Sequence, residues 1–331
     1  MDDNQNTHND IAIIGAGMAG LACATKLVAE GHDVQVFDKG RGPGGRMAAR
    51  RAEIAGETVS FDHGAQYFTA RDPGFQAVVE GWDDRGAAAR WSAAETRNGD
   101  VAWVGTPGMN GPIRAMADAI SAASKPALWG TRIETLARND NVWNLSAGDT
   151  VYTANTVLVA IPAEQACVLL TDAAPEFAQV SGSVVSEPCW AVMAAFDERL
   201  AIEADGLRDP DAPVSWAARN SAKPGRAGEE CWVLHASPAR SRDIIDLPKE
   251  EAATVLLGDF FAQTGIAPVE PVHCVAHRWL YAQPESVRGE PAHFDAANRI
   301  GMAGDFLHSP RVEGAWLSGT ALADCVINAS S

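Results

Sequence analysis

The chain has 331 residues, of which 47% are hydrophobic, and its formal net charge is −17. That apolar content is enough for a packed core, and the length favours two domains or one large elaborated domain. The acidic balance argues against nucleic acid or an anionic membrane surface as a partner, because both require a basic footprint.

The cysteines and the N-terminus indicate a cytoplasmic protein. Six cysteines lie far apart without a CxxC pair, which favours reduced thiols over a disulfide framework or a zinc site. The first ten residues, MDDNQNTHND, contain no basic residue, so we interpret them as a short disordered tail and not as a signal peptide. The apolar run from Ile11 to Ala29 carries three glycines, a threonine and a lysine, so a membrane span is not expected.

The same run is typical of a dinucleotide-binding unit. It predicts a buried strand over Ile11–Ile14, a helix from Met18 to Glu30 and a second strand, Val34–Phe37, that ends at Asp38. The turn between the first strand and the helix has the GxGxxG spacing of Gly15, Gly17 and Gly20.

Each glycine of this fingerprint has a separate role. The first permits the turn, the second lets the backbone approach a pyrophosphate, and the third lets the helix pack on the strand. The helix N-terminus presents free N–H groups to the phosphates. Asp38 is placed to accept hydrogen bonds from both hydroxyls of an adenosine ribose. The alternative is a glycine-rich structural turn without a ligand.

A second glycine-dense stretch, FDKGRGPGGRMAARR, follows directly at residues 37–51. So many glycines are incompatible with the interior of a helix or a strand. We expect Gly40, Gly42, Gly44 and Gly45 to carry backbone across the same pyrophosphate, with Arg46 supplying positive charge. The alternative is a solvated loop whose arginines face water.

The rest of the chain predicts a second domain with a mixed sheet. His273 and His277 are four residues apart but fall in a predicted strand, so no metal site is expected. The cofactor domain is expected to be discontinuous, with residues 1–75, 105–165 and 280–331, and the substrate domain to comprise residues 76–104 and 166–279. The predicted elements are a helix opened by Pro112, a meander of short strands over 127–153, strands at Asn155–Pro162, 189–196, 213–218, 231–236 and Val272–Trp279, and a helix over Lys249–Gln263.

Four stretches carry a resemblance to a known family. They are IAIIGAGMAGLACATKL, VFDKGRGPGGRMAARR, FDHGAQYFTARDPGF and IGMAGDFLHSPRVEGAWLSG. Together they resemble the flavin-containing amine oxidase superfamily and, within it, the renalase group, especially its bacterial members. The second and third stretches are the more specific. The resemblance runs from about Ile11 to Ala323 and implies an α/β fold, with an FAD-binding Rossmann-like domain and a second mixed-sheet substrate domain, as in amine oxidases and p-hydroxybenzoate hydroxylase.

The resemblance implies FAD, held without a covalent bond. The segment after the turn at Asp62 would lie beside the isoalloxazine ring, and the segment at Gly304 beside the ribityl chain and pyrophosphate. A helix from about Val312 would direct its N-terminus at the flavin N1 and C2 carbonyl, where its dipole favours the reduced anion. The implied cofactor-binding residues are Gly15, Gly17, Ala19, Gly20, Asp38, Lys39, Gly45, Arg46, Met47, Asp62, Gly64, Ala65, Gln66, Tyr67, Ile133, Gly304, Asp305, Glu313, Gly314 and Ala315.

Renalases resemble oxidases of 2- or 6-dihydroNAD(P), in which hydride passes to flavin N5, NAD(P)⁺ leaves and oxygen is reduced to hydrogen peroxide. Such a step needs no general base. The chain has only three tyrosines and five lysines, which is poor material for an amine-binding cage. Asn220 and His235 could hold the nicotinamide carboxamide, and Trp279 could flank the ring. Tyr67, which the resemblance places beside the isoalloxazine ring, is the fourth candidate catalytic residue.

Less specific readings remain open for these residues. His235 could cap a strand end, and Trp279 could be core. The basic run of Arg219, Lys223 and Arg226 could steer substrate phosphates or form a solvated loop.

Two other functions also stay open: a flavin amine oxidase or desaturase-like enzyme, and a flavin-binding protein without turnover. The expected partners are a small dinucleotide substrate and O2, without nucleic acid or membrane. The protein would be a monomer or homodimer, and the choice between the dihydro isomers, and between NAD and NADP, stays open.

Overall fold

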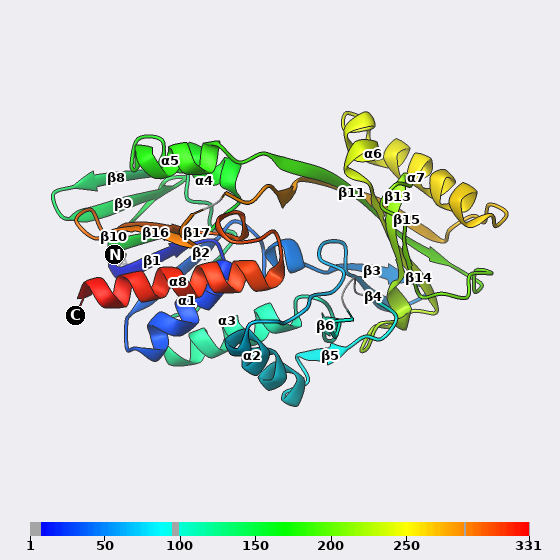
Figure 1. The fold of residues 1–331 in the computed structure, drawn as a ribbon, viewed down its shortest axis with the longest axis horizontal. Coiled ribbons are helices and arrows are strands. Elements are labelled where there is room, and N and C mark those ends of the chain that lie inside the picture. The colour runs from blue at the N-terminus through cyan, green and yellow to red at the C-terminus, as the bar shows by residue number, and fades with distance from the viewer. Residues whose placement is uncertain (1–7, 95–98, 288, 331) are drawn as a thin grey trace, which may run out of the picture. The chain divides into compact units, whose positions relative to one another are not determined.

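The computed structural model describes residues 8–94, 99–287 and 289–330 and divides into two compact units. Unit 1 takes its described residues from Met1–Gly45, Ile113–Val185 and Pro284–Ser331, and unit 2 from Arg46–Pro112 and Ser186–Gln283. The α/β class, with a Rossmann-like domain and a second sheet domain, is confirmed (Figure 1).

Unit 1 is built on a sheet with a parallel centre. β1 pairs in parallel with both β2 and β10, and β10 pairs in parallel with β17, while β9 and β16 add antiparallel pairings. The predicted strands at Ile11–Ile14, Val34–Phe37 and Asn155–Pro162 are confirmed as strands, although the third begins at Thr150 and ends at Val159. The path through the sheet is β16 (Ala292–Asp295), β17 (Ile300–Ala303), β10 (Thr150–Val159), β1 (His8–Ile14), β2 (Val34–Asp38) and β7 (Leu128–Trp129), and β8 (Thr135–Asn139) and β9 (Val142–Ala147) extend it from β10.

One end of β1 differs from the sequence prediction. His8 and Asn9, assigned to a disordered tail, pair with Thr153 and Ala154 of β10. The strand therefore begins three residues earlier than predicted, because its neighbour is long enough to pair with it. The rest of the predicted tail, residues 1–7, lies outside the described residues.

Helices cover both faces of this sheet. α1 (Met18–Ala29) and α8 (Val312–Ser330) lie side by side (Figure 1), so closely that a Cβ added at Gly319 would collide with the carbonyl oxygen of Ala19. α4 (Ala163–Leu170) and α5 (Pro175–Gly182) pack into an apolar core that includes Ile14 of β1. The predicted helices at Met18 and Val312 are confirmed.

Unit 2 contains a five-stranded sheet covered on one face by α7 (Lys249–Thr264) and the short α6 (Pro238–Asp243). Trp232 and Phe260 lie in the core between the sheet and α7. The described pairs β12–β13, β13–β14 and β14–β11 are antiparallel. The order is β12 (Gly206–Arg208), β13 (Val214–Arg219), β14 (Glu230–Ala236), β11 (Ser186–Phe196) and β15 (His273–Pro284).

The other face of this sheet carries a hairpin that the sequence reading did not identify as one. Val59 and Phe61 of its second strand pack on Met193 and Val233 of the sheet. The remaining elements are β3 (Arg50–Ile54) and β4 (Glu57–Phe61) of the hairpin, α2 (Pro73–Asp84), β5 (Ala88–Arg90), β6 (Trp103–Gly105), α3 (Gly111–Ala123), and the short 3₁₀ turns η1 (Gly45–Met47), η2 (Asn220–Ala222) and η3 (Asp305–Leu307).

The unit boundaries differ from the predicted domains. The hairpin belongs to unit 2, because it packs on that unit's sheet. Residues 166–185 belong to unit 1, because Leu169, Leu170 and Ala178 enter the core of the parallel sheet.

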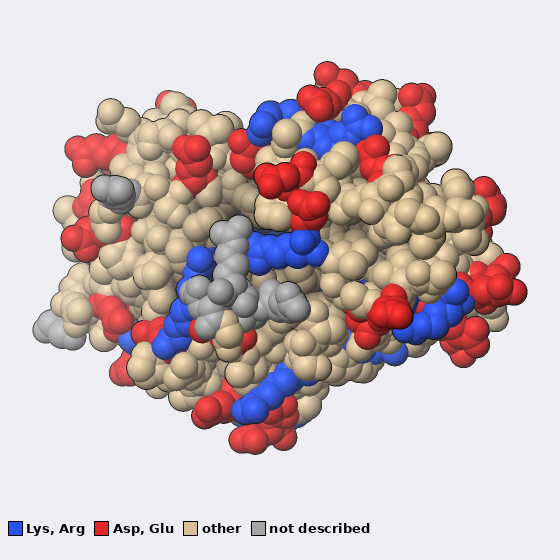
Figure 2. Space-filling model, turned by 45° about the vertical axis from the view of Figure 1, so that its right-hand side comes forward, with Lys and Arg blue, Asp and Glu red and all other residues tan. Residues whose placement is uncertain are grey.

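Within the described ranges, no helix has both the length and the apolar character needed to cross a membrane. On the face shown in Figure 2, lysines and arginines lie in short groups among aspartates and glutamates.

Candidate active site

The glycine fingerprint lies in unit 1, at the end of β1. Gly15 has a φ of 107°, and a Cβ there would collide with the carbonyl oxygen of Ala160. A Cβ at Gly20 would collide with the carbonyl oxygen of Gly15. Around an added Cβ at Gly17, in contrast, no described atom lies within 4 Å. Gly17 is also the N-cap of α1 and provides no side-chain cap. The open space and the helix N-terminus suit a pyrophosphate.

Asp38, at the end of β2, shapes the turn of the fingerprint. Its Oδ2 accepts from the Ala16 N–H at 2.7 Å, and its Oδ1 accepts from the Gly40 N–H at 2.6 Å. Each carboxylate oxygen has a second lone pair, so the side chain can still accept from a ribose hydroxyl. The adjacent Lys39 donates to Gln165 of α4 at 2.7 Å.

The second glycine stretch approaches the fingerprint. A Cβ added at Gly45 would lie 3.3 Å from the Cα of Gly17. Gly15, Asp38 and Gly304 all lie at the carboxyl ends of parallel strands, β1, β2 and β17. That edge of such a sheet is where dinucleotides bind, so unit 1 fits FAD.

Other predicted cofactor residues of unit 1 have structural surroundings. The Gly304 N–H donates to Ser318 Oγ of α8 at 2.8 Å, and a Cβ at Gly314 would collide with the Ser309 carbonyl oxygen. Asp305, Glu313, Ala315 and Ala19 are buried around the start of α8 and α1. Ile133 lies in the apolar core of the sheet, so its side chain is a packing residue.

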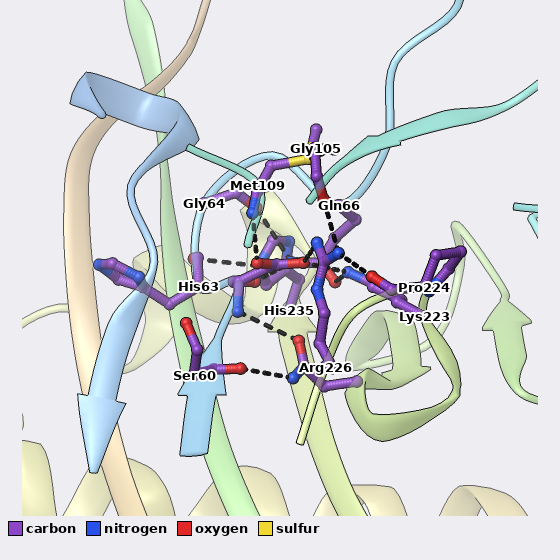
Figure 3. A network of polar contacts seen from close by, with 12 residues as sticks. Ser60, His63, Gly64, Gln66, Gly105, Met109, Lys223, Pro224, Arg226 and His235 are labelled. Atoms are coloured by element: carbon purple, nitrogen blue, oxygen red, sulfur yellow. Dashed lines mark hydrogen bonds and ion pairs between the residues drawn. The ribbon is translucent and has the colours of Figure 1, made fainter. Parts of the chain in front are cut away.

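Unit 2 contains a buried polar network centred on Asp62, the first residue after β4 (Figure 3). Its carboxylate accepts from Lys223 Nζ at 3.2 Å, from Arg226 and from the Met109 N–H at 2.8 Å. Burial opposes ionisation of Asp62, but the charges of Lys223 and Arg226 outweigh it, and the pKa lies below its ordinary value.

Lys223 is the buried cation of this network, and its side chain has no exposed surface. Nζ donates also to Gln66 Oε1 at 3.1 Å and lies 5.2 Å from the centre of the Trp91 ring. Burial lowers the pKa of Lys223 to about 8, and Asp62 opposes that change. Lys223 is therefore charged at neutral pH.

The charge of Lys223 fixes the orientation of Gln66. Because an ammonium group can only donate, Gln66 Oε1 must face it, and Gln66 Nε2 then donates to the carbonyl oxygens of Asp62 and Gly64. Those two bonds use both amide hydrogens. His235 Nε2, 3.3 Å from Gln66 Nε2, is therefore assigned the proton and donates to the His63 carbonyl oxygen at 3.2 Å.

His235 and Trp279, both predicted from sequence, meet at one atom. Trp279 Nε1 donates at 2.8 Å to the same His63 carbonyl oxygen that His235 contacts. Figure 3 shows the His63 ring pointing away from the network; it stacks on Trp279 with ring centres 5.1 Å apart. Burial, followed by the charge of Lys223, lowers the pKa of His235 to about 4. His235 is thus neutral at neutral pH, and its Nδ1 is a hydrogen-bond acceptor.

Asn220, expected to hold the nicotinamide carboxamide, instead bonds to the backbone at Asp62 and Ser60. It is fully buried, with Oδ1 accepting from the Asp62 N–H at 3.1 Å and Nδ2 donating to the Ser60 carbonyl oxygen at 2.7 Å. Both ends of its amide therefore hold the end of β4, and the side chain positions Asp62 instead of reaching a substrate. Tyr67, one residue beyond Gln66, contacts the ring of Trp216 at 5.4 Å between centres.

The predicted cofactor residues of unit 2 pack against one another. The Ala65 N–H donates to the Arg46 carbonyl oxygen at 2.8 Å, and a Cβ at Gly64 would collide with that oxygen. Met47 is buried beside them in η1. The Arg46 guanidinium lies 3.4 Å from the Ala282 carbonyl oxygen.

The basic run was misjudged at sequence level. Arg219 is buried against Glu230 and Asp205, and Lys223 and Arg226 are buried against Asp62. The run is therefore not a solvated loop, and each of its three cations is paired with a carboxylate. The run contains no acidic residue. That absence could have indicated that carboxylates elsewhere in the chain pair with these cations.

Comparisons with known proteins agree with this geometry. Residues 13–82 match the family described as NAD(P)-binding Rossmann-like domain, and residues 85–327 match the family described as Flavin containing amine oxidoreductase. The solved structure of a putative protoporphyrinogen oxidase from Exiguobacterium sp. 255-15 is similar, with a TM-score of 0.73, 13% identity and coverage of 96% of this chain and 98% of that one. A putrescine oxidase structure is also similar, with a TM-score of 0.70 and 15% identity. The match covers 97% of this chain and 99% of that one. These likenesses show a shared fold.

Curated relatives match over short segments. A zeta-carotene-forming phytoene desaturase of Myxococcus xanthus is 50% identical over 48 residues, 14% of this chain and 9% of that protein. Lysine-specific histone demethylase 1 homolog 3 of Oryza sativa subsp. indica is 39% identical over 62 residues, 19% of this chain and 8% of that protein. The matched segments thus span less than a tenth of these relatives. Because the second family match covers most of the chain, this protein belongs to the flavin-containing amine oxidoreductase family.

Proposed function

We propose that the protein is an FAD-dependent oxidase of isomeric dihydronicotinamide dinucleotides, the activity implied by its resemblance to the renalase group. The donor, 2- or 6-dihydroNAD(P), loses a hydride and becomes aromatic NAD(P)⁺. The two electrons, with the transferred hydrogen and one further proton, reduce O2 to hydrogen peroxide. FAD, when bound, would accept the hydride and pass its electrons to oxygen.

One observation carries the proposal: the charge of the buried network. Asp62 contributes one negative charge, Lys223 and Arg226 contribute two positive charges, and His235 is neutral. The network therefore has one excess positive charge inside unit 2, where charges are weakly screened. Such a charge disfavours a cationic amine substrate and favours an anionic dinucleotide.

The side chains of the network suit a hydride donor that carries a carboxamide. Neutral His235 can accept a hydrogen bond from a carboxamide N–H through Nδ1, and Trp279 offers an aromatic surface beside it. With a pKa of about 4, His235 is a weak base at neutral pH. A hydride transfer needs no base, so this is no obstacle.

The cofactor is proposed to lie across the glycine turn of unit 1. Gly17 and the N-terminus of α1 would receive the pyrophosphate, and Asp38 the adenosine ribose. Arg46 would add positive charge from the second glycine stretch, and Gln66 and Tyr67 would contact the flavin ring, as the resemblance implies.

Anaerobic rapid mixing tests the proposal. The purified holoenzyme is mixed separately with 2-dihydroNAD, 6-dihydroNAD, ordinary 4-dihydro NADH, benzylamine and putrescine, and loss of flavin absorbance is followed. The two isomers should bleach the flavin far faster than the other three donors. Admission of oxygen should then yield one hydrogen peroxide for each NAD⁺ formed. Faster bleaching by an amine would reject the assignment.

A second candidate is an amine oxidase or a desaturase-like enzyme. It is supported by the family match, by the fold shared with putrescine oxidase and cyclohexylamine oxidase, and by the short matches to carotenoid desaturases. The same mixing experiment separates it from the first proposal, because it predicts bleaching by amines or polyenes and no preference among dihydronicotinamides.

A further inference from the structure

A cavity of about 310 Å³ opens at the β12 edge of the sheet in unit 2. Its walls include Ser92 and Ala93 after β5, Asp205, Gly206 and Arg208 around β12, and Trp216 of β13. The volume is at the lower end of the range of small-molecule pockets. None of these residues belongs to the buried network around Asp62.

Strand register links this cavity to His235. Arg208 pairs with Trp216 across β12 and β13, and Trp216 pairs with His235 across β13 and β14. Paired residues project from the same face of a sheet, so the three side chains form a row. Adjacent strands are about 4.8 Å apart, which puts the Cα atoms of Arg208 and His235 roughly 10 Å apart.

The row continues into the candidate active site through aromatic contacts. The Trp216 ring lies 5.4 Å from the ring of Tyr67 and 6.4 Å from that of Trp91, measured between centres. Trp91 lies beneath Lys223, and Tyr67 follows Gln66 in the chain. Trp216 therefore lines the cavity and also contacts Tyr67 and Trp91, which are neighbours of the network.

Two charged side chains, Arg208 and Asp205, line the cavity. Arg208 is exposed and forms no ion pair with any residue that the structure describes. The Asp205 carboxylate also lines the cavity, but it is paired with buried Arg219 and lies 3.8 Å from Arg199. Arg219 is shared with Glu230.

Asp205 and Glu230 thus pair with Arg219 and Arg199, and Arg208 is the cation of the cavity wall that forms no ion pair with a described carboxylate. The carboxylate of Asp209, next to Arg208, accepts from the N–H of Asp211 in the following turn.

We propose that this cavity binds the phosphate groups of the dinucleotide substrate, with Arg208 as the residue that recognises them. The inference rests on the proposed function, in which the nicotinamide lies at His235. A substrate with its ring at His235 and its ribose along Trp216 would bring its pyrophosphate toward Arg208. Arg208 is then a specificity residue that separates phosphate-bearing donors from amines and from the free riboside.

Calorimetric titration of the holoenzyme tests this assignment without turnover. The ligands are NAD⁺, ADP-ribose and the phosphate-free nicotinamide riboside, and the variants are Arg208→Gln and Arg199→Gln. Arg199 is the matched control, because it is an exposed arginine of the same charge cluster that does not line the cavity.

Loss of a charged contact to phosphate should weaken NAD⁺ and ADP-ribose binding by roughly 10- to 100-fold in Arg208→Gln. Riboside binding should change less than twofold, and Arg199→Gln should change all three less than about threefold. Arg208→Lys should recover part of the affinity, because it restores the charge without the planar fork.

The outcomes separate this inference from the proposed function. If isomeric dihydronicotinamides bleach the flavin but Arg208→Gln binds NAD⁺ like the wild type, the phosphate site is rejected and the function stands. If Arg208→Gln loses ADP-ribose but no dihydronicotinamide bleaches the flavin, the proposed function falls and the phosphate site stands. Equal losses for riboside and NAD⁺ would also reject the site, since they would indicate a general disturbance of the sheet edge.

Discussion

Lys223→Met tests whether the buried lysine serves stability or function. The side chain is fully buried, its Nζ bonds to Asp62 and Gln66, and its pKa is about 8 compared with an ordinary value of 10.5. That difference corresponds to about 3 kcal/mol by which the fold disfavours the charged form. Removal of the charge at pH 7 therefore relieves a cost.

The variant also loses contacts. Gln66 Oε1 loses its donor, which costs about 1–3 kcal/mol for a buried acceptor. Asp62 keeps Arg226 and the Met109 N–H, so its carboxylate is not left unpaired, which is the situation that makes broken buried pairs so destabilising. The free energy of unfolding at pH 7 should consequently lie between the wild-type value and about 2 kcal/mol above it.

The pH dependence has a definite sign. The unfolded chain keeps the lysine proton up to about pH 10.5, whereas the folded protein releases it near pH 8. The unfolded state therefore binds more protons between these values, and the contribution of Lys223 to stability rises with pH in that window. Below pH 8 the full cost is present. Lys223→Met should remove this rise.

Urea unfolding of the holoprotein between pH 7 and pH 10, followed by tryptophan fluorescence, measures both effects. Lys249→Met, which removes an exposed lysine of the same unit, is the control and should retain the wild-type pH dependence. A loss of more than about 3 kcal/mol at pH 7, the scale of a broken buried pair, with an unchanged slope between pH 8 and pH 10, would refute the reasoning.

The remaining predictions concern the cofactor, the substrate and the turn. Acid precipitation should leave FAD in the supernatant and a colourless pellet, and Arg46→Ala should weaken FAD binding by about 1.5–3 kcal/mol in a fluorescence titration. His235→Ala should slow anaerobic flavin bleaching by roughly 3- to 30-fold while reoxidation by oxygen is unchanged; equal slowing of both half-reactions would contradict its proposed role. Asn220→Ala should lower the free energy of unfolding by about 2–4 kcal/mol, because the Asp62 N–H and the Ser60 carbonyl both lose a buried partner; wild-type stability with weakened NAD⁺ binding would instead return Asn220 to the substrate.

Local signals account for what the sequence predicted well. The fingerprint, its flanking strands and Asp38 interact within about 25 residues of chain, and steric demands on Gly15 and Gly20 leave few alternatives. The β3–β4 hairpin was less visible. Its turn residues, Ala55 and Gly56, both have positive φ, at 49° and 85°. Alanine is an unusual residue in such a turn, where Asn-Gly is the common signal. The sequence pattern therefore did not predict a hairpin here.

The network could not be predicted because its partners are distant in the chain. Asp62 meets Lys223 and Arg226 across separations of 161 and 164 residues. No periodicity or spacing relates such residues. Asn220 shows the same difficulty: its type suits a carboxamide contact, but only the fold shows that both ends of its amide are already used.

The polar groups of Asp62 explain why a costly lysine can be retained. Its N–H is held by Asn220, its carboxylate by Lys223, Arg226 and the Met109 N–H, and its carbonyl oxygen by Gln66. Segments far apart in the sequence thus fix one turn. The residues that follow this turn are those proposed to meet the flavin ring, and a site of that kind requires support from rigid neighbours. The same lysine contributes to the excess positive charge and, after burial, is the second cause that lowers the pKa of His235. Lys223 could add nothing to the free energy of unfolding, or lower it, and still be necessary for the enzyme to distinguish dinucleotides from amines. In that case function alone explains its burial.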